Sequence, residues 1–181
     1  QKIILNEDAM IVFDRMIALA DKHGLRLIIP FIDHWSWWGG KAELALMMGE
    51  QGNDDSKTGP IYDINSKTFA AYQDIIRKVI TRKNTLTGRK YRDEKAIMAW
   101  ETGNELRGTN TQFLAKTAAL IKSLAPNQLV VDGDQQADNI NAVGTVDVND
   151  GEFLGLIDPN VDIQSNHYYG KYMTASNLLA Q

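Results

Sequence analysis

The chain has 181 residues, of which 44% are hydrophobic and 23% are charged, a composition typical of a globular domain with a substantial core. The net charge is −4 and the basic residues are scattered, so neither nucleic acid nor an anionic membrane is expected as a partner. The absence of cysteine excludes disulfides and thiolate metal sites, and no segment is apolar over the length that spans a bilayer. We expect residues 1–181 to belong to one domain.

A helix followed by a strand is predicted at the start of the chain. Asn6 can cap the helix, acidic residues follow at its positive end, and Lys22 and Gly24 suit its last turn. The apolar run over 25–32 comes directly afterwards and predicts a strand.

The rest of the chain continues this alternation. Helical spacing of apolar residues predicts helices over 66–82 and 111–124, and apolar runs predict strands over 96–100, 129–133 and 161–165. The stretch between the last two strands is rich in Asn, Asp and Gly, so a full crossover helix is not expected there. Strands that alternate with helices indicate a parallel α/β sheet covered by helices.

Two architectures fit this order of elements. In a (β/α)8 TIM barrel, which typically needs about 250 residues, the four strands of this chain would form the central portion. The alternative is an open doubly wound sheet that binds a nucleotide. No glycine-rich phosphate loop follows any predicted strand, so no nucleotide cofactor is expected and the barrel is favoured.

The most informative motif is Trp100-Glu101-Thr102-Gly103-Asn104-Glu105, which begins at the last residue of the strand predicted over 96–100 and places an Asn-Glu pair after it. Active sites of barrels are built from the carboxyl ends of the strands. Asn104 offers an amide that can bind a substrate hydroxyl, and Glu105 offers a carboxyl. Their position therefore suggests general acid and base chemistry at Glu105.

Two other predicted strands end in aromatic and amide side chains. One runs into a loop with Trp35, Trp37 and Trp38, and the last runs into Asn166-His167-Tyr168-Tyr169. Tryptophan more often serves packing than ligand binding, but three in one loop are not easily buried together, so we expect one or two to stack on a sugar. Aromatic rings, amides and carboxylates together predict a carbohydrate-binding cleft.

On these motifs the chain resembles glycoside hydrolase family 5, and within it the endo-β-1,4-mannanases, over nearly its whole length. The family's fourth strand ends in Trp-Glu-x-x-Asn-Glu, as the motif ending in Glu105 does. Its third strand ends in an aromatic loop with Gly-Gly and its sixth in His-x-Tyr, and the matching residues here are Phe31, Asp33, Trp35, Trp38, Gly39, Gly40, His167 and Tyr169. Asp33 replaces the family's Asn, and Arg107 stands where mannanases often carry Arg.

The resemblance implies a retaining hydrolase acting on a β-1,4-linked polysaccharide, with mannan ahead of glucan. Glu105 would protonate the leaving glycosidic oxygen and later activate water, and Asn104 would hydrogen-bond the sugar 2-hydroxyl. Trp35 would stack on a sugar, and His167 and Tyr169 would bind near the carboxylates. The resemblance implies no cofactor, and an extracellular or periplasmic location.

The chain also departs from the family. A retaining enzyme needs a second carboxylate, and no residue here matches the family's nucleophilic Glu on the seventh strand. Glu101 matches a family position of its own and is interpreted as an interior residue that supports the site. The strand predicted over 129–133 corresponds to the family's fifth strand. It ends in Gly133-Asp134-Gln135-Gln136, which lacks the Glu of the family's Gly-Asp-Glu-Gly. A non-catalytic carbohydrate-binding protein, or an inactive fragment, therefore remains the alternative.

Metal binding is not expected. His34 and His167 are too few and too far apart in the sequence to indicate a metal site. The acidic stretch over 53–55 lacks the spacing of an EF-hand and is interpreted as a solvated loop.

Overall fold

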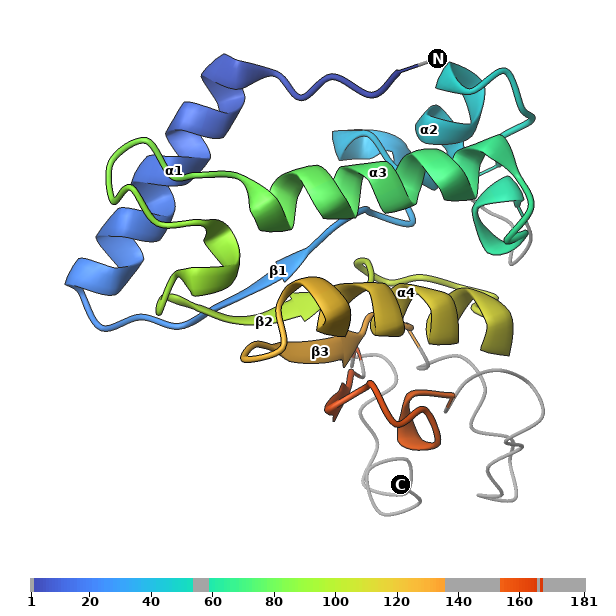
Figure 1. The fold of residues 1–181 in the computed structure, drawn as a ribbon. Coiled ribbons are helices and arrows are strands. Elements are labelled where there is room, and N and C mark those ends of the chain that lie inside the picture. The colour runs from blue at the N-terminus through green and yellow to red at the C-terminus, as the bar shows by residue number, and fades with distance from the viewer. Residues whose placement is uncertain (1, 54–58, 136–153, 166, 168–181) are drawn as a thin grey trace.

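The computed structural model describes residues 2–53, 59–135, 154–165 and 167. Helices and strands alternate along them: α1 (Glu7–Lys22), β1 (Leu27–Pro30), α2 (Lys41–Met47), α3 (Lys67–Thr81), β2 (Ile97–Glu101), α4 (Thr111–Leu124), β3 (Leu129–Asp132) and β4 (Ile163–Gln164). The strands form one parallel sheet in the order β1-β2-β3-β4 (Figure 1).

The parallel sheet with alternating helices confirms the predicted order of elements. The last strand is shorter than predicted, and α2 is not predicted because its seven residues are too few to show helical periodicity. Of the stretch between β3 and β4, residues 136–153 lie outside the described part, and a short 3-10 turn covers Leu154–Leu156.

Polar caps define where the three long helices begin. Asn6 accepts a hydrogen bond from the amide of Ala9 (3.2 Å), and Asn110 accepts one from the amide of Phe113 (2.9 Å). Ser66 caps α3 in the same way. Each cap satisfies an amide that has no partner within the helix, which typically stabilises the helix by about 1 kcal/mol.

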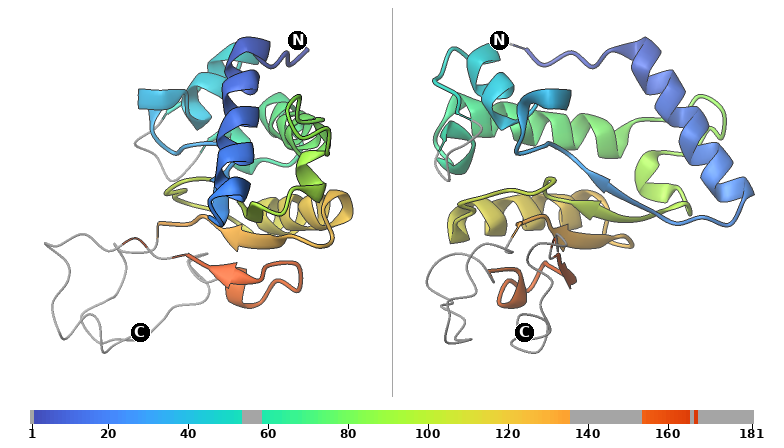
Figure 2. Two further views of the ribbon diagram at one scale, coloured as in Figure 1. Left: turned by 90° about the vertical axis from the view of Figure 1, so that its left-hand side faces the viewer. Right: turned by 180° about the vertical axis from the view of Figure 1, so that it is seen from behind.

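The hydrophobic core lies between the sheet and the helices on one of its faces. Ile29, Trp100 and Val130 are paired across β1, β2 and β3, and all three are buried. Helices α3 and α4 lie side by side over this face (Figures 1 and 2). Their buried side chains join the strand residues in one cluster, which also includes residues of α1; among them are Ile17, Tyr72, Ile76, Phe113 and Ile121.

Aromatic packing joins α3 to α4 and to the end of β2. The ring of Phe113 lies 5.2 to 5.8 Å from those of Tyr62, Phe69 and Tyr72. The buried hydroxyl of Tyr72 donates to the carbonyl oxygen of Thr102 (2.5 Å), just beyond β2. The helical layer therefore also positions the segment that follows β2.

A buried carboxylate ties α1 to the segment after α3, near the amino ends of the strands. Asp14 accepts hydrogen bonds from Arg82 Nε (3.0 Å) and Nη2 (2.9 Å), from the hydroxyl of Tyr91 (2.5 Å) and from Thr85. Burial opposes ionisation of Asp14, but the bonds from Arg82, Tyr91 and Thr85 outweigh it and hold its pKa well below the usual range.

Among the described residues, no helix is both long enough and apolar enough to cross a membrane.

We expect Asp14→Asn to lower the free energy of unfolding at neutral pH by about 3 kcal/mol, because it leaves Arg82 without its buried partner. Since the pKa of Asp14 is lowered in the folded state, its contribution is complete above the unfolded value of about 4 and is lost as the pH falls below that. Denaturant unfolding at neutral and acidic pH measures both effects.

Asp74→Asn is the matched control, because Asp74 forms an ion pair with Lys78 on α3 that is partly open to solvent, unlike the buried Asp14. Its effect should stay within about 0.5 kcal/mol. Equal effects of the two variants would contradict the role assigned to Asp14.

Candidate active site

Backbone hydrogen bonds fix the segment that carries Glu105 to the end of β1. The amide of Asn104 donates to the carbonyl of Ile32 (2.8 Å), and the amide of His34 donates to the carbonyl of Asn104 (2.9 Å). The side chain of Asn104 extends this contact, since its Nδ2 donates to Asp33 Oδ2 (3.3 Å). The segment with Asn104 and Glu105 is therefore fixed against the segment that follows β1.

The end of β3 holds the same segment from the other side. The amide of Leu106 donates to the carbonyl of Gly133 (2.9 Å), and the amide of Gly133 donates to Thr102 Oγ1 (3.0 Å). A Cβ at Gly133 would lie 1.6 Å from the carbonyl oxygen of Gly103, so only glycine allows the two strand ends to come this close.

The Gly-Gly pair shapes the aromatic loop after β1. Gly39 has φ +84°, a left-handed conformation that favours glycine. A Cβ at Gly40 would lie 2.3 Å from the carbonyl oxygen of Trp35. The side chain of Asp33 also stabilises the turn of this loop, because its Oδ1 accepts a hydrogen bond from the amide of Trp35 (2.9 Å). These constraints direct the indole of Trp35 toward the end of β2.

Glu105 has φ +53°, and it is the one residue other than glycine with positive φ in the described part of the chain. For an L-residue with a long side chain this conformation costs about 1 to 2 kcal/mol. Such strain persists where the surroundings over-determine it, often at functional sites. The hydrogen bonds on both sides of Glu105 supply that constraint.

The carboxyl of Glu105 contacts two of the predicted site residues. Its Oε2 accepts a hydrogen bond from Trp35 Nε1 (2.7 Å), and its Oε1 lies 3.0 Å from His167 Nδ1. The Glu105 side chain is only 9% exposed. The structure thus brings Trp35, Asn104, Glu105 and His167 to the carboxyl ends of the strands. Tyr169 lies outside the described residues.

The ring of Trp35 is packed among other side chains. The ring of His34 meets it edge-on at 4.8 Å, and Arg107 Cζ lies 5.7 Å from the ring centroid. The amide of Arg107 in turn donates to Nδ1 of the buried His34 (3.3 Å). Trp37 lies 5.7 Å from Trp35 and is 70% exposed, which makes it the more open aromatic surface.

Two further acids lie at the strand ends. Burial raises the pKa of Glu101 to about 7, with a further increase from Asp132 and an opposing effect from His167. Burial likewise raises the pKa of Asp132 to about 6, against hydrogen bonds that include one from the amide of Gly155. Glu101, interpreted from the sequence as an interior residue, is therefore partly protonated near neutral pH.

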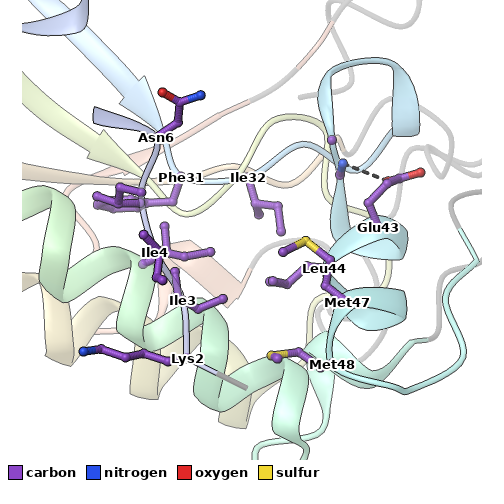
Figure 3. A pocket seen from close by; sticks show the side chains of 14 residues that line it. Lys2, Ile3, Ile4, Asn6, Phe31, Ile32, Glu43, Leu44, Met47 and Met48 are labelled. Atoms are coloured by element: carbon purple, nitrogen blue, oxygen red, sulfur yellow. Dashed lines mark hydrogen bonds between the residues drawn. The ribbon is translucent and has the colours of Figure 1, made fainter. Parts of the chain in front are cut away.

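A separate cavity of about 300 Å³ lies between the N-terminal segment and α2 (Figure 3). Ile3 and Ile4 face Leu44 and Met47 across it, and few polar groups reach it. Of the residues in the strand-end motifs, Phe31, Gly39 and Gly40 line this cavity, but Trp35, Asn104, Glu105 and His167 do not. An apolar lining does not suit a sugar, so the cavity is not part of the candidate site.

No group of three or more His, Asp or Glu side chains that could hold a metal ion occurs among the residues that the structure describes. The described part of the candidate site brings together a carboxyl, an amide, an imidazole and an indole.

Sequence reasoning did not anticipate that Trp35 donates to Glu105. The two residues are 70 positions apart, and no local pattern signals a contact at that separation. The supporting roles of Asp33 and His34 are likewise visible only in the structure.

Solved structures with the same fold are barrel glycoside hydrolases. The family 5 mannosidase of Rhizomucor miehei, solved with mannosyl-fructose, superimposes with a TM-score of 0.78 at 22% identity, over 94% of this chain and 42% of that one. The endo-β-1,4-mannanase of Thermotoga petrophila superimposes with a TM-score of 0.72 at 28% identity, over 88% and 37%. The chain thus has the fold of part of a TIM barrel.

A family model described as "GH family 5 beta-mannosidase-like" matches residues 1–172, so the chain belongs to glycoside hydrolase family 5. This confirms the family expected from the strand-end motifs.

Among curated relatives, a probable mannan endo-1,4-β-mannosidase F of Aspergillus flavus is 35% identical over 90% of this chain and 34% of its own length. Mannan endo-1,4-β-mannosidase 5 of Solanum lycopersicum is 34% identical over 85% of this chain and 37% of its own length. The chain therefore spans about a third of the length of these relatives.

We expect the change in the free energy of unfolding caused by Glu101→Gln to be more stabilising at about pH 8 than at about pH 5. Because the pKa of Glu101 is raised in the folded state, ionisation opposes folding increasingly from the ordinary value of 4.5 up to about 7. The free energy of unfolding of parent and variant at both pH values measures this difference.

Glu7→Gln is the control, because the hydrogen bond from Arg82 lowers the pKa of Glu7 and places its titration below this window. Its effect should be the same at both pH values. A Glu101→Gln effect that does not change with pH would show that Glu101 is ionised throughout.

Proposed function

We propose that this chain forms part of the catalytic domain of a retaining glycoside hydrolase that cleaves β-1,4-mannan, with Glu105 as acid and base. The observation that carries the proposal is the carboxyl of Glu105, held at the end of β2 between Trp35 Nε1 and His167 Nδ1. A carboxyl so fixed is pre-organised for proton transfer to a bound substrate.

Chemistry at this site would proceed in two halves. In the first, Glu105 protonates the glycosidic oxygen as the bond between it and the anomeric carbon breaks, and the electron pair of that bond stays on the leaving oxygen. At the same time a second carboxylate, to which no residue of this sequence corresponds, forms a covalent bond to the anomeric carbon. In the second half, Glu105 removes a proton from water, whose oxygen displaces that carboxylate.

The neighbouring side chains suit the binding of a sugar. Asn104 presents an amide beside Glu105, and Asp33 restrains it by accepting a hydrogen bond from its Nδ2. The remaining donor and acceptor capacity of Asn104 matches a sugar hydroxyl. His167 and, from the family motif, Tyr169 complete the proposed set of substrate contacts.

Mannan is proposed ahead of glucan because the similar proteins are named mannosidases and mannanases, and one of them was solved with mannosyl-fructose. Since mannan is a polysaccharide and does not enter cells intact, we also propose that the enzyme acts outside the cell or in the periplasm.

In the complete protein, Glu105→Gln should lower kcat on mannan by about 10²- to 10⁴-fold, because the amide keeps the shape of the side chain but carries no acidic proton. Affinity for mannooligosaccharides should change little. Steady-state kinetics and calorimetric titration of the same preparations measure the two quantities.

Glu7→Gln is the matched control, since Glu7 lies on α1 with its side chain 61% exposed and pairs with Arg82. It should retain the parent rate. A parent protein that binds mannooligosaccharides without cleaving mannan would replace the proposal with the carbohydrate-binding alternative, and a Glu105→Gln variant with the parent rate would remove Glu105 from the chemistry.

A further inference from the structure

We propose that Trp35 is a positioning residue that gives the two carboxyl oxygens of Glu105 different tasks. Oε2 remains a hydrogen-bond acceptor throughout the reaction, and Oε1 carries the proton that is transferred. This inference rests on the proposed function, because it concerns the same proton transfer. It also replaces the sugar-stacking role expected for Trp35.

The first argument is that an indole can only donate. Trp35 Nε1 lies 2.7 Å from Glu105 Oε2, and a tryptophan nitrogen has no acceptor capacity. If Oε2 were protonated it would become a hydroxyl oxygen, a weaker acceptor than a carbonyl or carboxylate oxygen. Keeping the hydrogen bond strong therefore requires the proton to be on Oε1.

The second argument is that Oε1 faces a group able to adapt. His167 Nδ1 lies 3.0 Å away, and an imidazole nitrogen donates or accepts according to its tautomer and protonation. Oε1 can therefore exist with or without a proton without leaving the imidazole of His167 unsatisfied. When Oε1–H gives its proton to the leaving oxygen, Glu105 is left as a carboxylate that still accepts from Trp35.

The third argument is that the indole is held in place. The rings of His34 and Trp35 pack in a T-shaped arrangement, and the guanidinium of Arg107 lies over the ring of Trp35. His34 is fully buried and accepts the amide of Arg107, so these contacts are mutually supporting. A donor fixed in this way restricts rotation of the carboxyl of Glu105. The burial of the Glu105 side chain, which is only 9% exposed, restricts the same rotation.

The test is Trp35→Phe in the complete protein, which keeps an aromatic ring and removes the indole N–H. We expect kcat/KM on mannan to fall about 10- to 100-fold, the loss expected for a hydrogen bond to an ionisable group. On a dinitrophenyl β-mannooligosaccharide, whose leaving group needs no proton, kcat/KM should stay within about 3-fold of the parent. Affinity for mannooligosaccharides should be unchanged.

Trp37→Phe is the matched control, because Trp37 belongs to the same loop and contacts the same ring but leaves the bond from Trp35 to Glu105 in place. It should preserve the ratio of kcat/KM on the two substrates. Equal losses on both substrates in Trp35→Phe would return Trp35 to sugar binding and overturn the inference. A parent inactive on both substrates would instead contradict the proposed function itself.

A second measurement does not depend on activity or on the folding of Trp35→Phe. In a proton–nitrogen spectrum of the parent, the N–H of Trp35 should be one of the indole resonances furthest downfield, because its bond to Glu105 is short. That resonance should move upfield in Glu105→Gln and stay in place in Glu7→Gln. If no indole resonance responds to Glu105→Gln, the proposed hydrogen bond is absent and the inference fails.

Discussion

The site depends on the backbone hydrogen bonds that join the ends of β1, β2 and β3. They hold the segment around Glu105 between two neighbouring strands, through Asn104 on one side and Leu106 on the other. Because these bonds are made by the backbone, they fix where the carboxyl can lie before any side chain contributes. The contacts from Trp35 and His167 then act on a group whose position is already determined.

The buried ion pair of Asp14 and the proposed catalytic site lie at opposite ends of the strands. Near the amino ends, Asp14 satisfies several donors at once and its pKa is lowered, as expected of a group that stabilises the fold. At the carboxyl ends, Glu101 and Asp132 have raised pKa values because burial opposes their ionisation. This division is typical of barrels, in which one rim stabilises the fold and the other reacts.

Much of the fold could be predicted because its signals are local. Caps such as Asn110 mark where helices begin, and the Asn104-Glu105 pair was recognised by its place after a strand. What could not be predicted depends on contacts distant in sequence: the hydrogen bond from Trp35 to Glu105, and the left-handed backbone that directs the acid. The catalytic role of Glu105 and the substrate-binding roles of Asn104, His167 and Tyr169 stay predictions.

The positive φ of Glu105 has a consequence for protein engineering. A procedure that optimises folding stability alone would choose glycine or asparagine at this position, since both tolerate the left-handed region better than glutamate. The carboxyl of Glu105 would then be among the first groups to be lost, and the product would be a more stable protein without its proposed proton donor. Any stabilised version of this domain therefore needs Glu105 held fixed, with improvements sought at the opposite rim.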